Sequence, residues 1–319
     1  MVPSRGSMAY RPVLCAGGCV IDRVGETADA KERLYTSNIG TMRTSLGGVA
    51  RNVAENLARL GVDVGLVSLV GDDLEGRRIV EESRRAGIDM SAVTPAAGAT
   101  TASYTAIFSG EGELVIGLAD MAIFDRIAPE TIAARMAAFP SEGYLFADAN
   151  LPPAALQAVA EAKGPRALAC VPVSVQKLAR LVPILAAIDI LFLNLYEARA
   201  LLGCEDEAEN LAARLATGPV PLGLLTLGPR GALAWQKGKV TPIAALASRP
   251  TNVNGAGDAL AGATLARLAA GDEFLTAARR AMAAAALTVE SPQTVRSDLT
   301  MRAVLARYAL SHPTETIAS

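Results

Sequence analysis

Short apolar runs alternate with helical stretches over the second half of the chain, and this alternation limits the fold more than any other feature. The runs are rich in Leu, Ala, Val and Ile and lie at residues 144–147, 167–171, 190–193 and 222–226. Strands that alternate with helices form a mostly parallel sheet, because each crossover helix packs back against a sheet face. We therefore predict an α/β protein with three layers, in which helices cover both faces of a mostly parallel central sheet.

The N-terminal half carries the same signals. Two further buried strands are expected at residues 13–16 and 64–70. An amphipathic helix opens after Gly48 and ends at Gly61, because glycine readily takes the left-handed conformation that closes a helix. The next expected elements are a helix over 74–86 and a strand near 88–93.

Two segments do not fit the alternation. Residues 103–108 and 113–116 flank a Ser-Gly-Glu-Gly turn and are typical of a β-hairpin. The other segment is polar and irregular, with strand-like positions at Leu34, Tyr35 and Met42. We expect the two segments, about 23–45 and 98–120, to form a small β-lid on a single domain spanning 9–319. Exposed strand edges usually need covering, so we also expect a homodimer joined through the lids.

The run NVNGAGD at 252–258 is a small-residue turn that opens a helix and places one carboxylate at the turn. Gly255, Ala256 and Gly257 allow close approach to the backbone, and amides left unpaired at a helix start bind anions. Asp258 beside such a site indicates phosphoryl transfer, with the amides holding the transferred group and the Asp taking a proton from the attacking hydroxyl. The alternative is that Asp258 only complements the helix dipole. That dipole should also lower the pKa of Asp258.

Composition and charge exclude several classes of function. A net charge of −2 and a pI of about 5.7 do not suggest a nucleic-acid partner or an acidic membrane, and no apolar run reaches the ~18 residues of a membrane helix. The four cysteines form no Cys-x-x-Cys pair and the single histidine, His312, lies in a polar tail. Both facts argue against a zinc site and against Ser-His-Asp or Cys-His catalysis. Residues 1–8 look like a cloning scar rather than a signal peptide, so we expect a cytoplasmic protein.

Polar residues gather where the expected strands end. Ligands of parallel sheets bind outside the carboxyl ends of the strands, so several polar residues at such positions indicate a site, although a cap or turn role would explain any one alone. These residues are Asp22, Asp148, Asn150, Asn194, Glu197, Thr226 and Gly228.

Five motifs, in this order and spacing, resemble those of the ribokinase-like (PfkB) carbohydrate and nucleoside kinases. They are GGCVID at 17–22, GGVARN at 47–52, NLYE at 194–197, TLGPRG at 226–231 and NGAGD at 254–258. The resemblance spans nearly the whole chain. It implies the ribokinase-like three-layer α/β/α fold with a β-lid, and a kinase that uses ATP and Mg²⁺.

The resemblance also implies a role for each matching residue. Asp22, Gly47, Gly48 and Asn52 would hold hydroxyls of a sugar ring. Glu197 would lie near Mg²⁺, which is bound partly through water. Asp258 would be the base and the amides of 255–257 the anion hole. The expected nucleotide-binding residues are Asn194, Thr226, Gly228, Gly231 and Asn254.

Within the family the chain most resembles the pseudouridine kinases, which phosphorylate the 5′-hydroxyl of a C-nucleoside. AENLARLG at 54–61, TASY at 101–104, GEL at 112–114, ADM at 119–121, ADAN at 147–150, PVS at 172–174 and NVNGAGD at 252–258 carry this likeness. It implies that Thr101, Asp120 and Asn150 help to read the ribose and the base. The alternatives are another substrate (ribose, a ketose, inosine or another nucleoside) and a non-catalytic nucleoside-binding protein. A dinucleotide dehydrogenase is disfavoured, because no Gly-x-Gly-x-x-Gly follows the first strand.

Three positions depart from the family pattern. Asn252 stands where many members have an Asp that often helps to bind potassium, which weakens the case for activation by K⁺. Asn254 replaces the usual Thr or Ala, and Val171 stands where relatives often have an acidic residue. The last two changes would alter contacts on the nucleotide side without removing the base.

Overall fold

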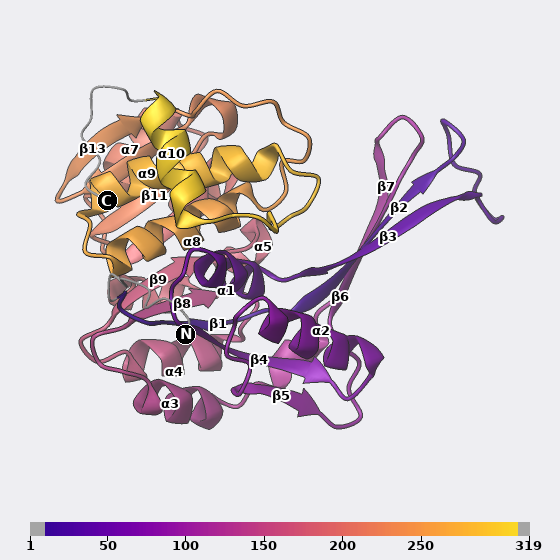
Figure 1. The fold of residues 1–319 in the computed structure, drawn as a ribbon, viewed down its shortest axis with the longest axis horizontal. Helices are drawn as coiled ribbons and strands as arrows, with labels where there is room; N and C mark the ends of the chain where they lie inside the picture. Colours follow the sequence, from indigo (N-terminus) through magenta and orange to yellow (C-terminus); the bar gives the residue numbers. More distant parts are fainter. Residues whose placement is uncertain (1–9, 312–319) are drawn as a thin grey trace, which may run out of the picture.

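The computed structural model describes residues 10–311, and it is built on a nine-stranded sheet (Figure 1). Neighbouring strands are parallel from β5 to β11, and β12 and β13 add an antiparallel edge. The predicted mostly parallel sheet is therefore confirmed. In sheet order the strands are β13 (Lys239–Ile243), β12 (Ala232–Gln236), β11 (Leu222–Thr226), β10 (Ile190–Asn194), β9 (Ala167–Val171), β8 (Tyr144–Asp148), β1 (Val13–Ala16), β4 (Val64–Gly71) and β5 (Val93–Ala96).

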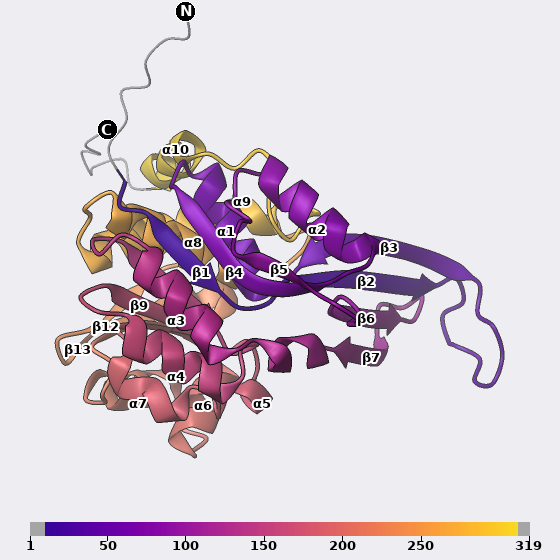
Figure 2. The ribbon, with the colours of Figure 1, turned by 90° about the horizontal axis from the view of Figure 1, so that it is seen from below.

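Alternate residues of each central strand face opposite helical layers. On β1, Val13 and Cys15 pack into one core, whereas Leu14 and Ala16 pack into the other, as the two-residue repeat of a strand requires. Figure 2 shows the helices on the two sides of the sheet. One layer contains α1 (Val49–Arg59), α2 (Leu74–Arg85), α8 (Ala256–Ala269), α9 (Phe274–Val289) and α10 (Met301–Ser311). The other contains α3 (Pro129–Ala138), α4 (Pro153–Ala162), α5 (Val175–Leu178), α6 (Leu195–Leu202) and α7 (Ala208–Ala216), with 3₁₀ turns η1 (Ala122–Arg126) and η2 (Val182–Ala187).

The antiparallel edge has its own packing centre. Trp235 on β12 is fully buried, and its indole nitrogen donates to the carbonyl oxygen of Val220 over 3.0 Å. Gly223 on the neighbouring β11 lies against the ring, and a Cβ there would come within 2.1 Å of it. The turn η3 (Gly228–Arg230) connects β11 to β12.

The lid is a second, four-stranded sheet that projects from the body as an arm (Figure 1). Its order is β3 (Gly40–Gly47), β2 (Val20–Thr27), β6 (Ser103–Phe108) and β7 (Leu114–Asp120). The hairpin of β6 and β7 lies where the sequence predicted it. The two ends of the segment predicted to be irregular, 23–45, instead belong to β2 and β3, whereas Leu34 and Tyr35 lie in the exposed connection between them. β3 is solvent-exposed over most of its length and so lacks apolar alternation; its pairing with β2 supplies the order.

A strand near 88–93 was also expected, but its predicted position is wrong by a few residues. Ile88 and Met90 are buried, but Asp89 makes only a single bridge to Gly65, and the strand itself is β5 at Val93–Ala96. The helices predicted after Gly48 and over 74–86 are confirmed as α1 and α2, and Gly61 has the expected positive φ of 89°. Among the helices described in the structure, none is long and apolar enough to cross a bilayer.

The base of the lid is tied to α2 by Thr101. Its hydroxyl donates to Asp73 Oδ1 over 2.5 Å and accepts from the Gly71 amide over 2.9 Å, and its own amide donates to Asp73 Oδ2 over 2.8 Å. Asp73 also caps α2 by accepting from the amide of Gly76. Thr101 is buried, so the hydroxyl expected to read the substrate is engaged in anchoring the lid strand β6.

Thr101→Val should therefore lower stability rather than substrate affinity. The change keeps the shape but leaves the Gly71 amide without a partner and removes one of the two hydrogen bonds that Asp73 Oδ1 accepts, which should cost about 1–3 kcal/mol of unfolding free energy. Urea unfolding measures this, and Thr94→Val, at an exposed position on β5, is the matched control, expected to stay within about 0.5 kcal/mol. A variant of normal stability with a raised KM would show that Thr101 contacts the substrate instead.

Candidate active site

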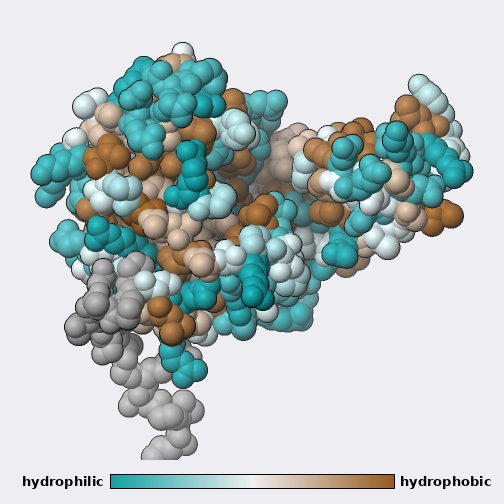
Figure 3. Space-filling model, turned by 90° about the horizontal axis from the view of Figure 1, so that it is seen from above, coloured by the Kyte–Doolittle hydropathy of each residue, from teal (hydrophilic) through white to brown (hydrophobic). Residues whose placement is uncertain are grey.

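A cleft of about 1,350 Å³ lies between the lid and the body, where Figure 3 shows the surface hollowed. The lid contributes Asp22, residues 43–46 and Tyr104, and α1 contributes Arg51, Glu55 and Arg59. The floor includes Asn252 and Asn254, which belong to the turn before α8, and residues 292–295. The cleft thus brings together segments far apart in the sequence, and both polar and apolar atoms form its walls.

The predicted anion hole is the start of α8. Gly255 is the N-cap, with φ at 80°, and a Cβ there would come within 2.0 Å of the Thr294 carbonyl oxygen. No side chain caps this helix end, so the first amides, those of Ala256 and Gly257 among them, are free of the usual competitor. A Cβ at Gly257 would meet nothing within 4 Å, so this face of the turn is open. An uncapped, open helix start is well suited to a phosphate.

Asp258 lies in the first turn of α8, and its carboxylate accepts a hydrogen bond from Asn52 Nδ2 over 2.8 Å. Its pKa is raised to about 7, chiefly by desolvation; the Asn52 hydrogen bond and Arg51 act in the opposite direction, while Asp148 and Asp22 raise it further. The expected lowering of this pKa by the helix dipole is therefore wrong. Burial beside two other carboxylates outweighs the dipole, and a base with a pKa near 7 is better matched to proton abstraction at neutral pH.

Asp22 lies on the lid strand β2, not at the carboxyl end of β1 as the sequence suggested. It is packed against Gly47 of β3, where a Cβ would come within 2.0 Å of its Oδ2. Burial raises the pKa of Asp22 to about 6, and Arg51 opposes this shift. Gly48 has φ at 95° and lies against the Gly18 carbonyl. Asp22, Gly47 and Gly48 thus lie where the lid joins the body, and their role in holding hydroxyls stays a prediction.

Asp148 holds the backbone around Gly18 and the start of α1 in place from a buried position. It is fully buried at the end of β8 and accepts from the amides of Gly18 (3.1 Å), Ala50 (2.8 Å) and Asn150 (2.8 Å). Ala50 is in the first turn of α1, so Asp148 caps that helix from a distant part of the chain. The sequence placed Asp148 correctly at a strand end but gave no sign of this capping role.

Two of the expected substrate residues are placed differently. The buried Asn150 accepts a hydrogen bond from Lys177 Nζ at 2.5 Å, and its Nδ2 lies against Gly18. Burial lowers the pKa of Lys177, with Asp148 opposing the shift. Asp120 is exposed at the end of β7, opposite Ser103. The structure therefore groups Asp22, Asn52 and Asp258, while Asp120 stands apart on the lid.

The expected nucleotide residues lie at the carboxyl ends of β10 and β11. Asn194 and Glu197 form a capping box at the start of α6, each accepting from the other's amide over 2.9 Å. Thr226 donates to the Leu193 carbonyl oxygen over 3.1 Å, and Gly228 has φ at 59° with open space around it. Gly231 is required by packing, because a Cβ would come within 2.1 Å of the Ile243 carbonyl oxygen.

A magnesium ion would find few direct ligands here. Within residues 10–311 no three Asp, Glu, His or Cys side chains are grouped as a metal site requires. Glu197 is buried, burial raises its pKa, and only its Oε2 is engaged by the Asn194 amide. This donor set fits an ion that is held mainly by phosphates and water.

The loop before α8 is closed by Asn252. Its Nδ2 donates to the Pro292 carbonyl oxygen over 3.1 Å, and its Oδ1 accepts from the Asn254 amide over 3.0 Å. The side chain thus cross-links the anion-hole turn to Pro292.

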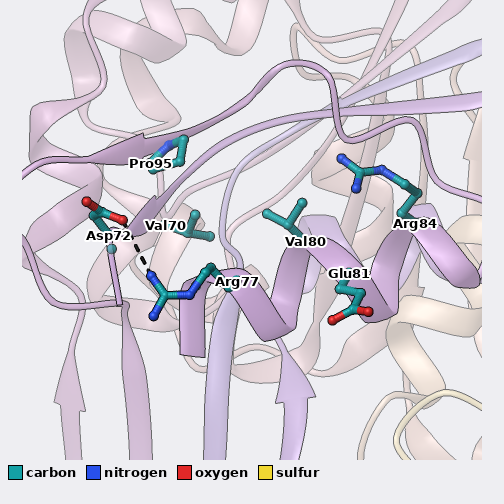
Figure 4. Close-up of a pocket in the computed structure, with 9 residues that line it drawn as sticks. Val70, Asp72, Arg77, Val80, Glu81, Arg84 and Pro95 are labelled. Carbon is teal, nitrogen blue, oxygen red and sulfur yellow. Dashed lines mark ion pairs between the residues drawn. The ribbon is translucent and has the colours of Figure 1, made fainter. Parts of the chain in front are cut away.

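A second, smaller pocket of about 380 Å³ lies beside α2 and β5 (Figure 4). Val70, Val80 and Pro95 line it, together with Arg77, which pairs with Asp72 over 3.6 Å. It contains none of the residues that the sequence singled out. The active-site hypothesis therefore rests on the cleft and not on this pocket.

Sequence reasoning missed several charged residues of the cleft, and Arg51 on α1 is the one that reaches toward Asp258 through Asn52. It is 5% exposed and contacts both Asn52 and Glu55. The available signal in the sequence was an arginine four residues before a glutamate on an otherwise apolar helix face. That spacing more often marks an ion pair on the protein surface.

Comparison with known proteins agrees with the geometry. The model of the pfkB family of carbohydrate kinases matches residues 11–301. Pseudouridine kinase from Escherichia coli is 27% identical over 301 residues, covering 92% of this chain and 95% of that protein. The uncharacterized sugar kinase YeiI from Escherichia coli is 36% identical over 130 residues, which span 41% of this chain and 36% of that protein.

The fold is shared with solved kinase structures. A carbohydrate kinase from Agrobacterium tumefaciens is 33% identical and superposes with a TM-score of 0.80, covering 94% of this chain and 97% of that one. The three-layer fold with a β-lid is the ribokinase-like architecture that the motifs implied. The chain belongs to the pfkB family of carbohydrate kinases and is an ATP-dependent kinase.

Proposed function

We propose that this kinase transfers the γ-phosphoryl group of ATP to the 5′-hydroxyl of pseudouridine. The observation that carries the proposal is the pairing of Asp258, a carboxylate with a pKa near 7, with the uncapped start of the helix in whose first turn it lies. The identity to pseudouridine kinase extends over almost the whole of both chains and supports the choice of substrate.

In the proposed mechanism Asp258 accepts the proton of the attacking hydroxyl. Asn52 holds the carboxylate in place, and the amides of 255–257 neutralise charge on the transferred group. Glu197 would hold Mg²⁺ through its water shell, and the ion would supply positive charge to neutralise the ATP phosphates. A loose transition state depends mainly on such orientation and charge neutralisation.

The walls of the cleft suit a nucleoside. Asp22 lines the cleft and, with the backbone of the adjacent Gly47 and of Gly48, would offer partners for ribose hydroxyls. Tyr104, on the lid strand β6, lines the same cleft and offers an aromatic face for the base. A kinase for ribose would not need this second contact, which is why we rank the nucleoside above the sugar.

Asp258→Asn tests the role of the base. The change keeps the size of the side chain but removes its ability to take a proton, so turnover should fall by ~10²–10⁴-fold while ATP still binds. Coupled ADP release measures turnover and calorimetry measures ATP binding. Asp63→Asn, an exposed loop position, is the control and should behave as wild type. Near-normal turnover of the Asp258 variant would reject the assignment.

A substrate panel tests the acceptor. Pseudouridine, uridine, inosine, ribose and fructose should be compared by kcat/KM, and pseudouridine should exceed ribose by at least about tenfold, the effect of ~1.4 kcal/mol of added transition-state binding. Because the Asn252 cross-link takes the place of a cation in our proposal, the panel should give equal rates in KCl and NaCl. Equal activity on ribose would remove the nucleoside assignment. Thermal stabilisation by a nucleoside without any ADP release would favour a binding protein, and strong stimulation by K⁺ would contradict the role of Asn252.

We also propose that two copies associate through their lids. Ile116 and Leu118 alternate along the edge strand β7, so they share one face, and they are 60% and 69% exposed; Leu114, beyond a register shift in the same strand, is 55% exposed. Brown, apolar surface is visible on the projecting arm in Figure 3. Such a face and edge are usually covered in a native assembly.

Light scattering should therefore give a mass near twice the 32.9 kDa of one chain. Ile116→Lys combined with Leu118→Lys should give monomers, because each charge would be buried unpaired in the interface. Leu310→Lys, on the exposed side of α10, is the matched control and should remain a dimer. A monomeric wild type at micromolar concentration would contradict the proposal.

A further inference from the structure

Three charged side chains follow one another along α1 beside the cleft. Arg51 pairs with Glu55, which also pairs with Arg59. Arg51 and Glu55 are both only 5% exposed. Burying an ion pair is often no better for stability than burying apolar side chains of similar size. Stability alone therefore gives a weak reason for Arg51, and its other contacts are the informative ones.

Arg51 extends toward the candidate base through one intermediate side chain. Its Nη1 donates to Asn52 Oδ1 over 3.0 Å, and Asn52 Nδ2 donates to Asp258 Oδ2 over 2.8 Å. The Nε of Arg51 donates to Ser83 Oγ over 3.3 Å, and its Nη2 is held by Glu55. The guanidinium is thus fixed at three points, and only one of them leads to Asp258.

The donors and acceptors of Arg51, Asn52 and Asp258 give this series of hydrogen bonds a fixed direction. A guanidinium can only donate, whereas an amide has one accepting and one donating end. By donating to Asn52 Oδ1, Arg51 forces Nδ2 to face Asp258. Without Arg51 the amide could rotate and turn its oxygen toward the carboxylate, which would replace an attraction with a repulsion.

We propose that Arg51 is a positioning residue, which orients the Asn52 amide so that Asp258 is held and charged for proton transfer. Glu55 and Ser83 hold Arg51 in turn. The proposal rests on the proposed role of Asp258 as the base.

Arg51 should act on Asp258 in two ways, through its positive charge and through the hydrogen bonds that orient Asn52. The groups that face this carboxylate are Arg51 and Asn52 from α1, Asp22 from β2 and Asp148 from the end of β8. Arg51 is the cation in this set, and it lowers the pKa of both Asp258 and Asp22. Removing it should therefore raise the pKa of the base and leave less of it ionised at neutral pH.

The test compares Arg51→Met, Arg51→Lys and wild type. Arg51→Met should lower kcat by about 10–100-fold, the scale of a misplaced reacting group, while KM for the nucleoside stays within about twofold. The acidic limb of the profile of kcat/KM against pH should move to higher pH by about 0.5–1 unit, because an opposing charge has been lost. Arg51→Lys keeps the charge, so its acidic limb should stay near that of wild type even if kcat falls.

Two further measurements keep the test decisive. Arg267→Met removes another buried arginine, which pairs with Asp272 at the far end of α8. It should lose stability without moving the acidic limb. In an Asn52→Ala background, Arg51→Met should cause little further loss of kcat, because the orienting effect passes through Asn52.

Each alternative has its own signature. A raised KM with unchanged kcat in Arg51→Met would mean that Arg51 contacts the substrate, and an unchanged kcat and acidic limb would mean that it only supports the fold. Either result overturns the proposal. If Arg51→Met does not fold, Arg51→Lys decides the test. An acidic limb that is displaced in Arg51→Lys would overturn the proposal. An acidic limb at the wild-type position, together with a lowered kcat of Arg51→Lys, would support it. Normal turnover of Asp258→Asn would instead reject the base itself, so the two failures are distinguishable.

Discussion

The buried carboxylate of Asp148 is the contact on which the rest of the site depends. It accepts from amides of the turn after β1, the first turn of α1 and the end of β8. The turn can come this close only because it is made of glycine, since a Cβ at Gly17 would lie 2.4 Å from the Asp148 carboxyl carbon. This arrangement fixes where α1 begins, and α1 carries the Asn52 that reaches Asp258.

Local signals in the sequence identified most of the body of the fold. The apolar runs at 144–147, 190–193 and 222–226 are strands in the central sheet, and the small-residue turn at 252–258 does open a helix. Such elements could be predicted because their burial imposes a period on the sequence. The lid strands β2 and β3 could not, because the largely exposed β3 carries no apolar period, the more buried β2 mixes polar and apolar residues, and their order comes from pairing with each other.

The sequence motifs pointed to Asp258, Asn52 and Asp22 together, but they did not reveal the electrostatics of this group. Asp258 accepts a hydrogen bond from Asn52 and is close enough to Asp22 for that carboxylate to raise its pKa, whereas the sequence suggested a lowered pKa for Asp258. Its raised pKa arises from burial and from Asp148 and Asp22, which are more than a hundred residues away. Thr101 shows the same limit, because its partners Gly71 and Asp73 are about thirty residues earlier. Couplings of this range leave no trace in local patterns.

The placement of Trp235 has a practical consequence. It is the only tryptophan of the chain, and it lies in the antiparallel edge of the body, enclosed against Gly223 and Val220. The fluorescence of Trp235 therefore reports on the integrity of that edge and does not respond to motion of the distant arm. Following how the arm closes over a ligand calls for an introduced chromophore on β6 or β7.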